Sequence, residues 1–231
     1  VGNEQSLHFV QLKTVLNKMG YEWADTLQHI PFGLILKDGK KLSTRKGKIV
    51  LLEEVLNEAI QLAEATIDEK NPNLMNKKEV AKAIGVGAII FSDLKQHRKH
   101  DIEFDLKKML QTEGETGPYV QYSYARACSI LRKAGAVDEC KVEEVNDHEW
   151  EVIRCLEQFP AVVKRAATEL DPSLMAKYAV ELAQGFNSFY GNVQIVSDSS
   201  LMAYRVSLVQ SVVIVLEESL RLLGIKAPKE M

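Results

Sequence analysis

The chain has 231 residues, of which 46% are hydrophobic and 26% are charged, so it can bury a substantial core and is long enough for two domains. Its formal net charge is -3 and its pI is near 6.0, which excludes bulk attraction to nucleic acid and requires any polyanionic partner to bind at a local basic patch. Cys128, Cys140 and Cys155 include no Cys-x-x-Cys pair, so we expect reduced packing cysteines, no disulfide framework and no metal site.

Residues 1–20 are expected to form a strand end, a glycine turn and a helix. Apolar residues recur with helical spacing between Leu7 and Met19, Asn3 is a good helix cap, and Gly20 closes the helix. In doubly wound α/β domains such a turn lies where ligands bind, although polar side chains at a helix start are more often simply solvated. The candidate ligand contacts at this turn are Gly2, Gln5 and His8.

Residues 37–48 are the most basic stretch of the chain, with six cations against one carboxylate. Residues 29–36 before it are expected to form a short apolar strand, and Asp38-Gly39 is a tight-turn signal. A loop that combines ammonium, guanidinium, hydroxyl and backbone N–H groups can hold an anion. A charge run taken alone is more often a solvated loop.

Two helices are expected next. The first covers residues 53–65 and is amphipathic, with Leu62 among its buried residues. Asn76 and Glu79 resemble a capping box that begins the second. The second helix ends in a basic cluster at residues 95–100, which suits a phosphate backbone and equally suits a solvated helix end stabilised by the helix dipole.

Residues 116–134 are expected to form a helix with Pro118 in its first turn and Gly135 after its end. Tyr119, Tyr122 and Arg126 recur at spacings of three and four, so an aromatic and cationic stripe follows one face. Such a stripe usually contacts another helix. The more specific interpretation is that these side chains stack against nucleic-acid bases.

The rest of the chain is expected to be an α-helical bundle. Asp147 would cap a helix that runs to about residue 158, and Pro160 would break or restart it. A further helix is expected over 171–190, opened by an Asp-Pro pair, and a final one from residue 198 or 199 to Gly224.

Several ordered motifs occur along the chain: Gly2-Asn-Glu-Gln-x-x-His8, Lys41-Leu-Ser-Thr-Arg-Lys-Gly47, Thr116-Gly-Pro-Tyr-Val-Gln-Tyr122 with Ala125-Arg126, Phe186-Asn-x-Phe-Tyr190 and Ala227-Pro-x-x-Met231. Together they resemble one family, the arginyl-tRNA synthetases of class I. Leu42 stands where a methionine is common in the family, and Thr44 stands where the general class I loop has its second lysine, so which cation of the loop meets the phosphates is left open. The family's His-Ile-Gly-His-type motif is absent from this sequence.

The resemblance implies a mainly α fold that corresponds to roughly the C-terminal two-fifths of such an enzyme. Residues 1–115 would be the second half of a Rossmann-type catalytic domain with few strands, with the lysine–serine loop at 37–48 and a stem-contact region at 51–115. Residues 116–231 would be the α-helical anticodon-binding domain.

The resemblance also implies an arginine–tRNA ligase, which uses ATP with Mg²⁺ to form arginyl-adenylate and then transfers the arginyl group to arginine tRNA. Cations of the loop would neutralise the charge on the leaving pyrophosphate, a hydroxyl of the loop would donate a hydrogen bond to it, and the first glycine turn would hold the adenosine. The implied loop residues are Lys41, Ser43, Arg45 and Lys46, and the adenosine contacts are Gly2, Gln5 and His8.

For the tRNA, the family likeness implies an anticodon pocket around Asn187, Tyr190 and Met231, where unstacked bases are read. Lys95 and Arg98 would contact the phosphate backbone. Four further residues would contact the tRNA body or fix the interdomain angle: Tyr119, Gln121, Tyr122 and Arg126.

Three other interpretations stay open: a cysteinyl-type class I synthetase, a standalone RNA-binding module without catalysis, and a purely structural helical scaffold. Val1 is not a native start, so we expect the chain to be part of a longer, monomeric protein. This part is expected to be inactive alone and to self-associate through its truncated sheet. With no signal peptide and no apolar run of membrane-spanning length, we expect a cytoplasmic protein without membrane association.

Overall fold

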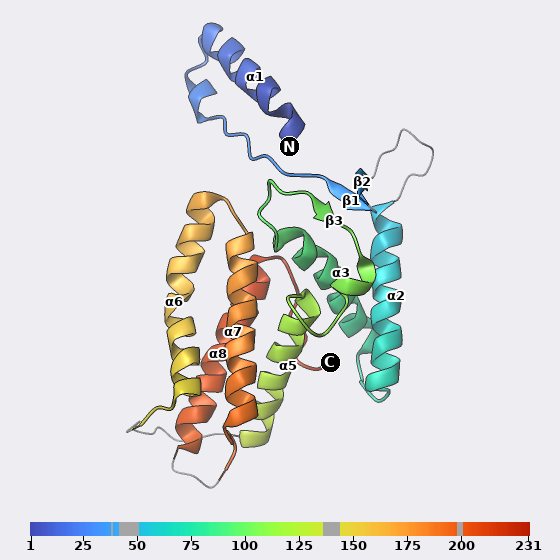
Figure 1. Ribbon diagram of the computed structural model, residues 1–231, viewed down its shortest axis with the longest axis vertical. Helices are drawn as coiled ribbons and strands as arrows, with labels where there is room; N and C mark the ends of the chain where they lie inside the picture. The colour runs from blue at the N-terminus through green and yellow to red at the C-terminus, as the bar shows by residue number, and fades with distance from the viewer. Residues whose placement is uncertain (38, 42–50, 136–143, 198–200) are drawn as a thin grey trace. The chain divides into compact units, whose positions relative to one another are not determined.

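The computed structural model describes residues 1–37, 39–41, 51–135, 144–197 and 201–231 (Figure 1). The chain divides into two compact units, the first made of residues 1–49 and 96–105 and the second of residues 50–95 and 106–231. Helices dominate and strands are few, which confirms the expected mainly α fold. None of the helices in the described ranges is long and apolar enough to cross a membrane.

The first unit begins with a short 3₁₀ helix, η1 (Asn3–Gln5), and continues as α1 (Ser6–Lys18). Gly20 follows with φ +85°, the left-handed conformation that glycine adopts at low cost, so the predicted helix and its end are confirmed. Several apolar side chains of α1 are exposed, and Leu7 and Val10 are 68% and 63% exposed, whereas Phe9 stacks on the His29 ring with 4.5 Å between the ring centres.

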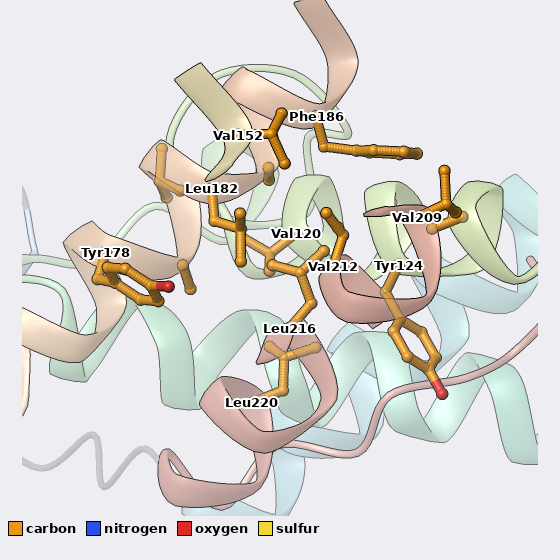
Figure 2. Close-up of a cluster of buried hydrophobic side chains, with 14 of the residues drawn as sticks. Val120, Tyr124, Val152, Tyr178, Leu182, Phe186, Val209, Val212, Leu216 and Leu220 are labelled. Carbon is orange, nitrogen blue, oxygen red and sulfur yellow. The ribbon is translucent and has the colours of Figure 1, made fainter. Parts of the chain in front are cut away.

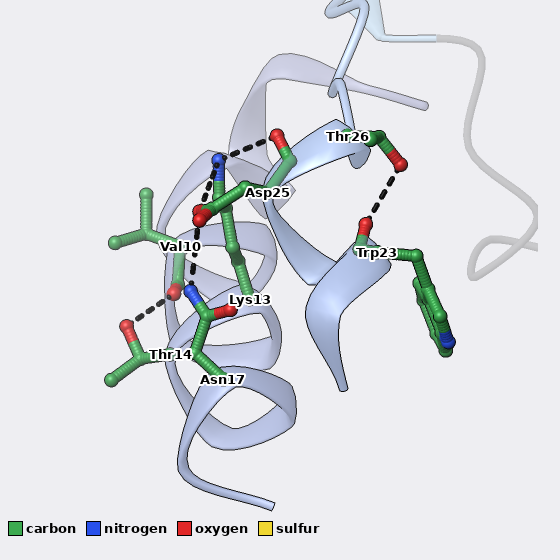
Figure 3. Close-up of polar contacts among 7 residues, drawn as sticks. All are labelled: Val10, Lys13, Thr14, Asn17, Trp23, Asp25 and Thr26. Carbon is green, nitrogen blue, oxygen red and sulfur yellow. Dashed lines mark hydrogen bonds and ion pairs between the residues drawn. The ribbon is translucent and has the colours of Figure 1, made fainter. Parts of the chain in front are cut away.

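A second 3₁₀ helix, η2 (Glu22–Thr26), returns beside α1 and is held by polar contacts (Figure 3). The Lys13 ammonium donates to the backbone carbonyl of Asp25 at 3.1 Å, and the Asn17 amide donates to the Asp25 carboxylate at 3.3 Å. These two donors lower the pKa of the Asp25 carboxyl, with the Asn17 hydrogen bond as the larger cause. Surface hydrogen bonds therefore join the two helices.

The small sheet of the first unit has the order β2-β1-β3. Strands β1 (Ile35–Lys37) and β2 (Lys40–Lys41) pair antiparallel, while β1 and β3 (Ile102–Glu103) pair parallel. Gly39 lies in the turn between β1 and β2 with φ +67°, and its N–H donates to the Glu103 carboxylate at 3.3 Å. The tight turn predicted from Asp38-Gly39 is thus present, with Asp38 itself outside the described residues.

Two features of this sheet differ from expectation. The strand predicted over 29–36 is limited to β1, because Pro31 has no N–H to pair and Phe32 makes only an isolated bridge with Gly2. Strand β3 was not predicted at all. Its two residues carry no alternating pattern, and it pairs only because the chain returns to β1 in space.

The second unit opens with α2 (Leu52–Lys70), α3 (Lys77–Leu94) and the short α4 (Leu106–Met109). α2 is longer than predicted and packs closely on α3: a Cβ on Gly85 would lie 2.7 Å from the backbone nitrogen of Ile60. This close approach turns the α2 face that bears Ala59, Ala63 and Ile67 inward. The prediction that Leu62 is buried was wrong, because it lies on the outward face.

The expected capping box at α3 is also absent from the described structure. Asn76 is the N-cap residue, but its side chain makes no capping hydrogen bond there, so the Asn76 and Glu79 pair marks the helix start without forming the motif.

Four helices form the bundle of the second unit: α5 (Gly117–Ala134), α6 (Asp147–Glu169), α7 (Ser173–Asn192) and α8 (Met202–Leu222). Their apolar faces meet in one core, to which each helix contributes (Figure 2). The bundle predicted from the sequence is confirmed. Large core side chains drawn from the four helices are Val120, Tyr124, Val152, Tyr178, Leu182, Phe186, Val209, Val212, Leu216 and Leu220.

The prediction that Pro160 breaks α6 was wrong. The proline lacks an N–H for the carbonyl of Leu156, yet Leu156, Phe159 and Val163 pack against the core on both sides of it and keep the helix continuous. The cap of α6 is Asn146 rather than Asp147, and it forms a complete capping box with Glu149.

The cysteines in the described residues are free thiols, and Cys140 lies outside those residues. Burial raises the pKa of the Cys128 thiol and raises the pKa of the Cys155 thiol to about 11. Both are therefore protonated, unreactive packing groups at neutral pH.

Candidate functional site

A pocket of about 630 Å³ lies within the second unit. Its walls come from α2, α3, α5 and α7, from the segment after α4, and from residue 231. The aromatic rings of the lining and its arginine lie on α5, while its other polar groups come from α2, α7 and the segments after α2 and α4. The lining residues are Ala63, Thr66, Ile67, Lys70, Asn71, Ile84, Leu110, Thr112, Glu113, Tyr119, Tyr122, Arg126, Asn187 and Met231.

Arg126 is the centre of the α5 and α7 wall. Its guanidinium carbon lies 4.8 Å from the ring centre of Tyr122 and 5.0 Å from that of Tyr190, and its Nη1 donates to Oδ1 of Asn187. A planar cation on two aromatic faces is electrostatically favourable and is held in a defined orientation. Tyr122 and Tyr190 remain well exposed, so the rings are accessible beside the cation.

Asn187 joins α7 to α5 through further hydrogen bonds. Its Nδ2 donates to the Tyr119 hydroxyl at 3.0 Å and to the Ser123 hydroxyl at 2.8 Å. The α5 partners share a face because the helix begins at a fixed point: the Thr116 side chain accepts from the backbone N–H of Tyr119, and a proline occupies the first turn. Positions three, four and seven residues apart then project together.

The segment after α8 closes one side of the pocket. Gly224 ends the helix with φ +75°, and Arg132 donates to the backbone carbonyl of Lys229 at 3.2 Å and pairs with Glu230 at 3.3 Å. The backbone carbonyl of Met231 accepts from the Asn71 amide at 3.2 Å. These contacts place Met231 in the pocket wall.

Gln121 lies elsewhere. It is 0% exposed, and its Nε2 donates to the backbone carbonyls of Ala83 at 3.0 Å and Lys226 at 2.7 Å. The α3 helix comes close enough for this only because Gly87 has no Cβ, which would lie 2.8 Å from the Gln121 amide nitrogen. Gln121 therefore ties α5 to α3 and to the segment after α8, and in this conformation it is not accessible to a macromolecule.

The two candidate phosphate contacts belong to different units. Lys95, in the second unit, donates from its ammonium to the backbone carbonyl of Glu115 at 3.0 Å and lies outside the pocket lining. Arg98, in the first unit, accepts from the Gly33 N–H at 2.8 Å through its backbone carbonyl.

The candidate nucleotide contacts lie in the first unit. Gly2 forms the bridge with Phe32 and has an extended backbone, while Gln5 and His8 are exposed on η1 and α1. The structure thus keeps the three residues at one turn, with both side chains accessible to solvent.

Of the candidate loop residues, Lys41 ends β2 opposite Leu36. The others, Ser43, Arg45 and Lys46, lie outside the described residues.

The sequence interpretation missed two polar residues that shape the pocket. Ser123 lies four residues after Tyr119, so helical spacing alone places it on the same face as that tyrosine. Asn71 carries a weaker signal, because beside Pro72 it is typical of a helix stop, which it also is.

Two known family models match the chain, one in each half. Residues 1–106 match the family model for the tRNA synthetases class I (R) catalytic domain, and residues 120–231 match the DALR anticodon binding domain. The two matched segments therefore correspond to parts of class I aminoacyl-tRNA synthetases. Arginine–tRNA ligase 1 of Bacillus thuringiensis subsp. konkukian is 56% identical over 232 residues, and that of Ligilactobacillus salivarius is 54% identical over 233 residues. The chain belongs to the arginyl-tRNA synthetase family.

Solved structures give the same assignment. Arginyl-tRNA synthetase of Thermus thermophilus matches 96% of this chain with a TM-score of 0.88 and 35% identity, and the match covers 39% of that chain. The Plasmodium falciparum enzyme matches 100% of this chain with a TM-score of 0.81 and 25% identity, covering 40% of its own length. The chain spans about two-fifths of the length of the curated relatives it matches.

Proposed function

We propose that this chain is the tRNA-binding and ATP-loop portion of an arginine–tRNA ligase, and that the pocket beside Arg126 receives an unpaired base of the anticodon of arginine tRNA. The observation that carries this proposal is the guanidinium held between two accessible tyrosine rings at the wall of a pocket of about 630 Å³. Unstacked RNA bases are recognised on aromatic and guanidinium planes together with hydrogen bonds to their edges.

The charge of Arg126 supports the same occupant. Within the described ranges, Arg126 is partly buried and contacts two tyrosine rings and the Asn187 amide oxygen rather than a carboxylate. No acidic side chain among these contacts neutralises its positive charge. An RNA loop brings both phosphate charge and hydrogen-bond acceptors to such a group.

For the catalytic half we propose that Lys41, Ser43 and Arg45 or Lys46 stabilise the pyrophosphate that leaves ATP. Gly2, Gln5 and His8 would bind the adenosine. The Mg²⁺ would enter bound to the ATP phosphates. The functional division we propose is 1–115 and 116–231, and aminoacylation of tRNA would take place in the cytoplasm.

Binding of the purified chain to arginine tRNA, measured at two salt concentrations, tests the proposal. We expect that altering the anticodon weakens binding at least about fivefold at both salt concentrations, because one stacked base contributes about 1–3 kcal/mol. A tRNA of another identity is the matched control and should bind as weakly as the altered one. Equal and purely salt-dependent binding of the three tRNAs would overturn the pocket assignment.

We also expect the 231 residues alone to form no arginyl-tRNA. Four apolar side chains of α1, those of Leu7, Val10, Leu12 and Val15, are exposed, which is consistent with a catalytic unit whose packing partners lie outside this chain. Charging of tRNA with radiolabelled arginine, beside a full-length arginyl-tRNA synthetase as positive control, measures this. Product above the enzyme-free background would refute the expectation.

A further inference from the structure

The hydrogen bonds of Asn187 have only one consistent direction. Arg126 has N–H donors and no acceptor, so the Asn187 atom that faces it must be the amide oxygen. The amide nitrogen must then face the hydroxyls of Tyr119 and Ser123, at 3.0 Å and 2.8 Å. The reverse orientation would set N–H groups against the guanidinium.

This direction determines what the two hydroxyls do. Ser123 donates its own hydrogen to the backbone carbonyl of Tyr119 at 2.9 Å, so toward Asn187 it only accepts. Tyr119 also accepts from Asn187, which leaves the hydroxyl hydrogen of Tyr119 free to donate to another group. Tyr119 and Arg126 both line the pocket, and each has N–H or O–H donors that Asn187 does not use.

The Asn187 amide nitrogen has no free hydrogen to donate to a ligand. This nitrogen has two hydrogens, and the Tyr119 and Ser123 hydroxyls accept them both. Direct reading of a base by the Asn187 amide N–H would require one of these internal hydrogen bonds to break.

We propose that Asn187 is a positioning residue that holds Tyr119 and Arg126 as hydrogen-bond donors at the pocket wall, so that this wall selects a base edge rich in acceptors. The group recognised is a carbonyl oxygen or an unprotonated ring nitrogen of an unpaired base. This inference rests on the proposed function for the identity of the ligand, whereas the positioning role of Asn187 does not depend on it.

A double-mutant cycle tests the proposal, with the anticodon stem-loop of an arginine tRNA as the probe. Tyr119→Phe removes the donor and is expected to weaken binding about fivefold. Asn187→Asp keeps the shape but replaces the N–H groups with an acceptor, so the Tyr119 hydroxyl turns toward residue 187 and away from the ligand. Once Asn187→Asp is present, adding Tyr119→Phe should therefore weaken binding by less than about twofold.

The matched control is Asn192→Asp on the same helix. Asn192 is exposed, donates to the backbone carbonyl of Ser188 at 2.9 Å and lies outside the pocket lining. The Asn192→Asp variant introduces the same negative charge as Asn187→Asp. The amount by which Asn187→Asp weakens stem-loop binding more than Asn192→Asp does therefore measures the positioning effect. Effects of Tyr119→Phe and Asn187→Asp that multiply independently would overturn the proposal.

A second readout needs no RNA and no substitution of Asn187. In nitrogen-15 NMR spectra, the side-chain amide protons of Asn187 should exchange slowly with solvent and should shift in Tyr119→Phe. Fast exchange in the unsubstituted chain would overturn the positioning role. Slow exchange, together with failure of that chain to bind the stem-loop, would establish the positioning role and refute the proposed function along with the ligand class.

Discussion

Replacing Arg205 with methionine is expected to lower the free energy of unfolding by about 3–5 kcal/mol, because it leaves a buried carboxylate without its partner. The Arg205 Nε lies 2.8 Å from Oε1 of Glu149, and the two side chains are only 15% and 1% exposed. Arg205 also donates to the backbone carbonyl of Gln194 at 3.0 Å. Urea denaturation followed by circular dichroism measures the loss.

Two further variants separate this effect from a general sensitivity of the bundle. Arg221→Met removes the same charge from an exposed pair with Glu218 at the end of α8, and we expect little change from it. Adding Glu149→Gln to Arg205→Met should recover part of the lost stability, since the uncompensated charge disappears. An equal loss from Arg205→Met and Arg221→Met would show that the buried pair contributes nothing special.

Replacing Arg126 with methionine is expected to weaken binding of the arginine anticodon stem-loop about 10- to 100-fold. The substitution removes the cation between the Tyr122 and Tyr190 rings and its hydrogen bond to Asn187. It also removes the donor that we propose for the base. Stacking and a charge-assisted hydrogen bond each contribute about 1–3 kcal/mol, and 1.4 kcal/mol corresponds to tenfold. Titration of a labelled stem-loop gives the affinity.

The Arg221→Met variant is also the matched control for Arg126→Met, because it changes the net charge by the same amount at a position outside the pocket lining. We expect it to bind the stem-loop almost as well as the unsubstituted chain. Arg126→Lys keeps the charge but loses the planar group, so an intermediate affinity would assign part of the effect to stacking. If Arg126→Met and Arg221→Met lose affinity equally, only bulk charge is involved and the pocket assignment fails.

The helices could be predicted from the sequence where a local signal decides their ends. Gly20 and Pro118 act within one turn of chain, so the neighbouring residues are sufficient to place the end of α1 and the start of α5. Pro160 shows the limit of such signals. Its intrinsic cost to a helix is local, but the packing that outweighs it comes from helices distant in sequence.

Only part of the candidate site could likewise be predicted from local sequence signals. The spacing of Tyr119, Tyr122 and Arg126 predicted a shared face, and the structure brings them together. Gln121 was grouped with them although it follows Tyr119 by two residues, which turns it to another side of the helix. That Asn187 meets this face could not be predicted, because the rotation of α7 against α5 is set by the whole core.

The contact between Asn71 and Met231 has a consequence for the order in which the protein forms. This one hydrogen bond joins positions 160 residues apart, and pairings so distant close late because chain entropy opposes them. On the ribosome, α2 and α5 are complete long before residue 231 has been added. A nascent chain can therefore hold folded helices while the pocket is still open on one side, and the wall that contains Met231 is completed only after synthesis passes that residue.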